Sequence, residues 1–209
     1  MPRVAIIDIG SNSIKILIAA RTAAGKVEAL KTKTLDARIS AGIGKAKPEL
    51  SDDGMRRGLA AIRELLAEAA VFSPDKIILV ATSAVRDAAN GEVFREQVRT
   101  ATGHKIRILS GDEEANLIGR GLTCDPALGK LNDFYVFDLG GGSLECLAFR
   151  ERKIAQAISL QLGCVRLTER FITDPTAPLQ KSEVTALALY VRDELKRSGF
   201  RFAIVAPAA

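Results

Sequence analysis

Two short stretches of the sequence combine an acid with a run of small residues. Asp8 in IDIGSNS and Asp138 in FDLGGGS each close an apolar segment, and a second apolar segment follows each turn. Small residues leave backbone N–H groups accessible, and such turns can form nests that bind anions. A tight hairpin is the alternative for either turn alone, but two equivalent copies favour the nest. The candidate phosphate-binding residues of the turns are Gly10, Ser11, Asn12, Ser13, Gly140, Gly141, Gly142 and Ser143.

An acid beside a bound phosphate is unfavourable unless a cation lies between them. Asp8 and Asp138 therefore indicate Mg²⁺, a hard ion that bridges carboxylate and phosphate oxygens and keeps several of its waters. Glu145 follows Asp138 by seven residues and opens the next apolar segment, from which it could reach the same cleft. The single histidine, His104, excludes a multi-histidine metal site and a Ser-His-Asp triad. Acid–base chemistry is therefore left to carboxylates.

The segment ILSGDEEANLIGRGL offers another carboxylate for such chemistry. Ser110 and Glu113 fit a capping box, in which both side chains bond the backbone at the start of a helix. Glu114 has no capping role and lies in the first helical turn. It could simply interact favourably with the helix dipole. It could instead orient and deprotonate a water that attacks phosphorus, as a general base.

Three basic residues near these motifs remain open in role. The sequence ATSAVRDAANG follows a short apolar segment, and in open α/β sheets ligand contacts usually lie after such strands. Arg86 there could hold a phosphate with two hydrogen bonds, or it could be an exposed arginine at the start of a helix. Lys15, after the first turn, could neutralise phosphate or face solvent. Arg38 is open in the same way.

Apolar periodicity predicts the order strand-strand-strand-helix-strand twice, separated by a stretch rich in turn formers at 123–133. This pattern predicts a duplicated α/β unit whose two Asp-Gly turns face each other across a cleft. Strands are expected at 3–9, 13–20, 26–36, 76–82, 106–110, 134–138, 143–149, 152–160 and 202–206. Helices are expected after Ser51 to about 71, at 91–102, at 112–122, from about 163, and at 182–197.

Composition narrows the class of protein and its partners. The 209 residues are 47% hydrophobic and 26% charged, as in soluble globular proteins, and they suffice for a sizeable core. No apolar run is long enough to cross a bilayer and no secretory leader is evident, so we expect a cytoplasmic protein without membrane contact. Three widely spaced cysteines indicate reduced core thiols. The net charge of +5 favours a phosphorylated small molecule or polymer over a specific nucleic acid.

Five blocks of the sequence resemble the exopolyphosphatase and guanosine pentaphosphate phosphohydrolase (Ppx/GppA) family: IDIGSNSIKILIA, ATSAVRDAANG, ILSGDEEANLIGRGL, FDLGGGSLE and LGCVRLTERF. They stand in the family's order and spacing. The resemblance implies a duplicated actin-like, ribonuclease H-like fold of two domains. With the boundary in the turn-rich stretch, we expect these domains at 1–125 and 126–209. It also implies removal of terminal phosphates from polyphosphate or pppGpp with Mg²⁺. Glu114 is then the catalytic base, Asp138 and Glu145 bind metal or water, and Arg86 lies in the cleft.

The resemblance departs from the family at the end of the sequence. Family members continue beyond the position of Pro207, so the second domain is expected to be incomplete. The leading hypothesis is a phosphoanhydride hydrolase. The alternatives are an actin-like ATPase or small-molecule kinase and a non-catalytic protein that binds (p)ppGpp or polyphosphate. A homodimer is a further expectation.

Overall fold

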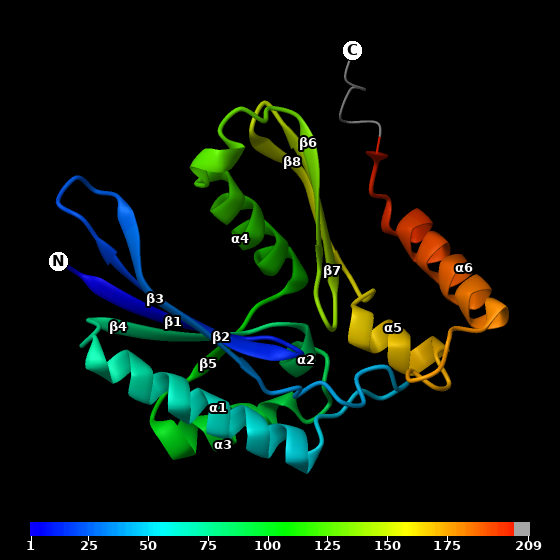
Figure 1. Cartoon of the computed structure of the whole chain (residues 1–209), viewed down its shortest axis with the longest axis horizontal. Coiled ribbons are helices and arrows are strands. Elements are labelled where there is room, and N and C mark those ends of the chain that lie inside the picture. The colour runs from blue at the N-terminus through cyan, green and yellow to red at the C-terminus, as the bar shows by residue number, and fades with distance from the viewer. Residues whose placement is uncertain (203–209) are drawn as a thin grey trace. The chain divides into compact units, whose positions relative to one another are not determined.

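The computed structural model describes residues 1–202 and divides into two compact units, one of Met1–Leu109 and one that begins at Ser110 (Figure 1). The division falls earlier than the boundary expected after residue 125. The reason is helix α4 (Gly111–Thr123), which packs against strands of the second unit. Gly119 makes this packing close, since a Cβ there would lie 2.8 Å from Leu147 and 2.6 Å from Ile154. The helix that carries Glu114 therefore belongs with the second glycine-rich turn.

The first unit is a five-stranded sheet in the order β3-β2-β1-β4-β5. Strand β1 runs antiparallel to β2 and parallel to β4, and β5 extends the parallel part. Its elements are β1 (Arg3–Ile9), β2 (Ser13–Arg21), β3 (Val27–Asp36), α1 (Asp52–Val71), β4 (Lys76–Ala81), α2 (Ser83–Arg86), α3 (Gly91–Thr102) and β5 (Ile106–Ile108).

One face of this sheet forms the core of the first unit. Ala5, Ile7 and Ile9 of β1 are completely buried, and strand alternation places Asp8 on the opposite face. Helices α1 and α3 lie along the buried side (Figure 1). Helix α1 begins where the Ser51 hydroxyl accepts the N–H of Gly54 at 3.0 Å, an N-cap that satisfies one of the open donors of the first turn.

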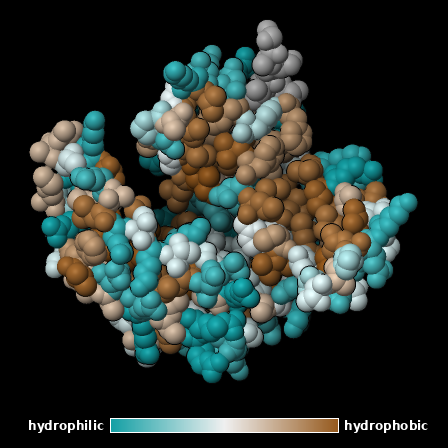
Figure 2. Space-filling view, in the orientation of Figure 1, coloured by the Kyte–Doolittle hydropathy of each residue, from teal (hydrophilic) through white to brown (hydrophobic). Residues whose placement is uncertain are grey.

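The second unit is built on a three-stranded antiparallel sheet in the order β6-β7-β8. Helix α4 covers one face, while α6 contributes to an apolar cluster on the other, where Figure 2 shows apolar side chains gathered. Phe134 and Phe149 stack as a cross-strand pair, with ring centroids 4.4 Å apart. The remaining elements are η1 (Pro126–Leu128), β6 (Phe134–Leu139), β7 (Leu144–Arg150), β8 (Lys153–Leu160), α5 (Cys164–Phe171) and α6 (Lys181–Ser198).

Most predicted elements are present within one or two residues of their expected ends. Helix α2 was not predicted, because its four residues are too few to show a helical period. The expected strand at 202–206 lies outside the described residues apart from Phe202. The expectation of core cysteines is wrong for Cys124 and Cys164, which are exposed, and correct for Cys146.

Among the described helices, none combines the length and apolar composition that a bilayer-crossing segment needs.

Candidate active site

The first small-residue turn is held from behind by the chain that follows β3. The N–H of Gly10 donates to the carbonyl of Ser13 at 3.1 Å and closes the hairpin. The carbonyl of Ser11 accepts from Ser40, and that of Asn12 accepts from residues 37 and 38. Within residues 1–202 the N–H groups of Ser11 and Asn12 donate to no acceptor. The turn therefore has its carbonyls engaged and its donors available, the polarity that an anion nest needs.

The second turn has the same arrangement with a different support. Gly140 donates to the Ser143 carbonyl at 3.0 Å, and the first N–H groups of α5 then take the turn's carbonyls: Cys164 donates to Gly140 at 2.9 Å and Val165 to Gly141 at 2.9 Å. In the described chain no acceptor faces the N–H groups of residues 141–143. The first N–H groups of α5, which have no acceptor within the helix, thus donate to the carbonyls of the turn. The N–H groups of the turn itself remain available for a ligand.

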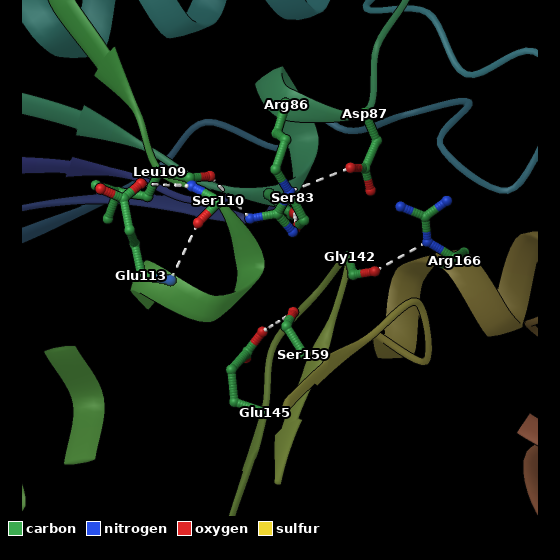
Figure 3. Close-up of polar contacts among 11 residues, drawn as sticks. Ser83, Arg86, Asp87, Leu109, Ser110, Glu113, Gly142, Glu145, Ser159 and Arg166 are labelled. Atoms are coloured by element: carbon green, nitrogen blue, oxygen red, sulfur yellow. Dashed lines mark hydrogen bonds and ion pairs between the residues drawn. The ribbon is translucent and has the colours of Figure 1, made fainter. Parts of the chain in front are cut away.

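Arg166 completes the support of the second turn. Its side chain is only 6% exposed, and Nε donates to the carbonyl of Gly142 at 2.9 Å (Figure 3). Gly163, at the N-cap of α5, lies so close that a Cβ would come within 2.3 Å of the Gly142 carbonyl carbon. Helix and turn are therefore packed backbone against backbone, which fixes the direction of the free N–H groups.

The acids before the turns have cross-strand partners on the same face of their sheets. Asp8 pairs with Lys15, and Asp138 pairs with Glu145. Opposite residues of an antiparallel pair project on one side, so Lys15 lies beside Asp8, and Glu145 lies beside Asp138. Glu145 is 2% exposed and its Oε1 accepts the hydroxyl of Ser159, its partner on β8, at 2.6 Å (Figure 3).

Helix α4 starts over this acidic face of the second unit. A Cβ on Gly111 would lie 2.7 Å from Cβ of Ser159, so the first turn of α4 touches the residue that bonds Glu145. Glu114 lies three positions after Gly111 and is partly buried, and residues three positions apart are neighbours on a helix surface. The half-buried Glu114 and the buried Glu145 therefore belong to one neighbourhood.

Glu113 has the structural role that its spacing predicts. Its N–H donates to the Ser110 hydroxyl at 3.1 Å, and its Oε2 accepts the Ser110 N–H at 2.9 Å (Figure 3). The capping box is confirmed. Of the two adjacent glutamates on this helical turn, Glu113 is turned back to the helix start, where it caps the backbone.

Three features of the first unit follow the carboxyl ends of its parallel strands: the first small-residue turn, Ser83 and Arg86. The hydroxyls of Ser11 and Ser83 are 3.2 Å apart and buried. Arg86 is not an exposed arginine, since Nη1 donates to the Leu109 carbonyl at 3.1 Å and Nε reaches Asp87 Oδ1 at 3.3 Å (Figure 3). Its guanidinium is fixed at the sheet edge where α/β folds bind ligands.

Comparison with known proteins shows the family of this chain. Residues 17–204 match the Ppx/GppA phosphatase family. The chain belongs to that family. The sequence is also 33% identical over 208 residues to exopolyphosphatase 2 of Mycobacterium tuberculosis, with 94% of this chain and 62% of the relative covered. This Ppx/GppA chain thus spans less than two thirds of the relative's length.

Solved structures show the same α/β fold. An exopolyphosphatase from Cytophaga hutchinsonii superposes with a TM-score of 0.84 at 23% identity, covering 92% of this chain and 60% of that one. The PPX-GPPA enzyme of Aquifex aeolicus superposes with a TM-score of 0.72 at 28% identity, covering 94% and 64%. The family resemblance read from the five sequence blocks is confirmed.

The acids of this Ppx/GppA chain have the donor chemistry that Mg²⁺ prefers. Magnesium binds carboxylate oxygens, usually one or two from the protein, and retains waters. Asp138 and Glu145 offer two such groups on one sheet face, and Asp8 offers one in the first unit. No cluster of three His, Cys, Asp or Glu side chains is found within residues 1–202. The residues therefore fit a hydrated ion bound partly through substrate, rather than an all-protein cage.

Sequence reasoning missed three polar residues that organise these turns: Ser83, Ser159 and Arg166. Arg166 lies in the block LGCVRLTERF, but nothing in its type or spacing shows that its guanidinium is buried against a glycine carbonyl. Ser159 becomes visible only through the β7–β8 register, which pairs it with Glu145. Neither residue has a sequence motif of its own that marks this role.

Proposed function

We propose that this protein hydrolyses terminal phosphoanhydride bonds of inorganic polyphosphate. Membership of the Ppx/GppA phosphatase family supports the reaction class, and the names of the relatives support the substrate. The observation that carries the proposal is the second turn, where α5 engages the carbonyls of residues 140–142 and Gly140 engages that of Ser143. The N–H groups of residues 141–143 remain available. Such a turn, one residue pair away from Asp138 and Glu145, suits a phosphate chain bound with a cation.

In this proposal each residue has a separate task. The N–H groups of both turns bind phosphate oxygens, and Arg86 and Lys15 add positive charge. Glu114 accepts the proton of the attacking water, which the Glu145–Ser159 pair helps to position. Asp8, Asp138 and Glu145 would hold Mg²⁺, which when bound offsets charge on the phosphate oxygens. The two units would act as the two actin-like domains of the enzyme.

The competing substrate is pppGpp, because its terminal phosphoanhydride bond would be hydrolysed by the same chemistry. Inorganic polyphosphate is the better choice because the Mycobacterium tuberculosis relative, 33% identical over 208 residues, is named an exopolyphosphatase. A solved structure that shares the fold carries the same name. An ATPase or kinase would turn over ATP, and a non-catalytic binding protein would bind phosphate chains without cleaving them.

The experiment measures orthophosphate released from long-chain polyphosphate, with and without Mg²⁺, and repeats the assay with pppGpp and with ATP. We expect Mg²⁺-dependent release that a chelator abolishes and that is faster with polyphosphate than with the other two substrates. Preferred ATP turnover would contradict the proposal. So would calorimetric binding of polyphosphate with no release in the presence of Mg²⁺.

A further inference from the structure

Arg38 has a left-handed backbone conformation that is strained for arginine and would not be strained for glycine. Among residues 1–202, four residues other than glycine have positive φ: Arg38, Ser73, Glu151 and Arg152. Three of them have ordinary reasons. Ser73 follows the C-cap of α1, and Glu151 and Arg152 form the two-residue turn of the β7–β8 hairpin, both places where left-handed residues are common. Arg38, with φ of 45°, lies in neither kind of turn.

The surrounding chain forces Arg38 into this conformation. Its N–H donates to the carbonyl of Asn12 at 2.8 Å, inside the first small-residue turn. Its own carbonyl accepts Nη2 of Arg57 at 2.9 Å. The residues on either side, Ala37 and Ile39, are buried and anchor the segment. The left-handed backbone conformation raises the free energy of a residue with a side chain by on the order of 1 kcal/mol or more, whereas glycine adopts it without this strain.

The side chain at this strained position is an exposed cation. Within residues 1–202 the Arg38 guanidinium makes no ion pair and no hydrogen bond, so it does nothing for the fold that would offset the strain. Strain that contributes nothing to stability is typical of binding sites. The bond from the Arg38 backbone N–H to the Asn12 carbonyl joins this residue to the turn whose N–H groups are available for phosphate.

We propose that Arg38 is a substrate-binding residue whose guanidinium takes a phosphate group next to the one held by the first turn. This inference rests on the proposed function, because it assumes a substrate with consecutive phosphates. A guanidinium binds phosphate oxygens with two parallel hydrogen bonds and stays charged at every working pH. Arg38 therefore selects a chain of phosphates over a single orthophosphate ion.

Two variants separate binding from backbone strain. Arg38→Gly removes the cation and relieves the strain, whereas Arg38→Gln removes the cation and keeps the strained backbone. Arg95→Gln makes the same charge change on α3, where Arg95 pairs with Glu92, and serves as the control. The readouts are thermal unfolding, KM and kcat for polyphosphate, and calorimetric binding of inorganic tripolyphosphate.

We expect both Arg38 variants to raise KM and to weaken tripolyphosphate binding about tenfold or more, the size of one charge-assisted contact. Arg38→Gly should also unfold at a higher temperature than wild type, and Arg95→Gln should match wild type in KM. Unchanged tripolyphosphate binding in both Arg38 variants would overturn the inference, as would a wild-type chain that does not bind tripolyphosphate. Tripolyphosphate binding without any phosphate release would refute the proposed hydrolase. The affinities of the Arg38 variants for tripolyphosphate would still decide whether Arg38 binds phosphate.

Discussion

Substituting Gly163 by alanine probes how the second turn is positioned. Gly163 has φ of −65°, a conformation that alanine adopts easily, so backbone strain does not enter. The added methyl group would lie 2.3 Å from the carbonyl carbon of Gly142 and 2.4 Å from that of Gly141. Ordinary contact begins at 3.4 Å, so the backbone of helix and turn would separate by about 1.1 Å. Neither neighbour is a flexible side chain that could move aside.

This displacement should reduce stability and activity together. Overpacking by one methyl group typically costs about 1–3 kcal/mol. The same shift moves the N–H groups of the Gly140–Ser143 turn, and a misplacement of about 1 Å in a reacting group costs roughly a hundredfold in rate. We therefore expect Gly163→Ala to lower the free energy of unfolding in urea by this amount, and kcat/KM for polyphosphate by roughly a hundredfold.

Gly121→Ala is the matched control for this experiment. Gly121 lies in α4, where an added Cβ meets nothing within 4 Å. Alanine in such a helical position should stabilise by about 0.5–1 kcal/mol and leave kcat/KM unchanged. If Gly163→Ala kept wild-type unfolding and wild-type kcat/KM, the backbone packing of α5 on the turn would not be what positions the site.

Two further predictions concern the interior of the second unit. Ser159→Ala removes the hydroxyl that donates to the buried Glu145, so urea unfolding should show a loss of about 1–3 kcal/mol, and an unchanged unfolding midpoint would contradict that role. Burial and the neighbouring Glu145 charge raise the pKa of the Cys146 thiol to about 11. At pH 8 a thiol reagent should therefore label the exposed Cys124 and Cys164 in the folded protein and reach Cys146 only after unfolding; labelling of all three at one rate would refute this.

Sequence alone predicted the features that depend on local spacing. The two turns, the capping box at Ser110 and the alternating strands follow from residue type and period, and the structure has them. Helix α4 shows where this reasoning ends. Its sequence predicts a helix but not its packing partner, so the boundary expected after residue 125 differs from the division at Leu109. Which sheet a helix covers depends on contacts far apart in the chain.

The hydrogen bonds that hold the two turns could not be predicted from the sequence either. A glycine run predicts available N–H groups, but the direction of these groups depends on which donors form hydrogen bonds with the carbonyls of the turn. In the first turn these are the backbone N–H groups of residues 37, 38 and 40, and in the second they come from α5 and Arg166. Such long-range hydrogen bonds leave no periodic signal. The assignments of Mg²⁺ ligands and of Glu114 as base remain predictions from the sequence.

The role of Glu114 is tested most directly by comparing Glu114→Gln with Glu113→Gln. Both variants remove one negative charge from the first turn of α4, and glutamine can still cap the helix at position 113. Glu114→Gln should lower kcat for phosphate release from polyphosphate by about 10²–10⁴-fold, with polyphosphate binding and thermal unfolding near wild type. Glu113→Gln should keep kcat within a few-fold. Wild-type kcat in Glu114→Gln would contradict the account, because the Glu114 carboxylate would then not be the group that activates the water.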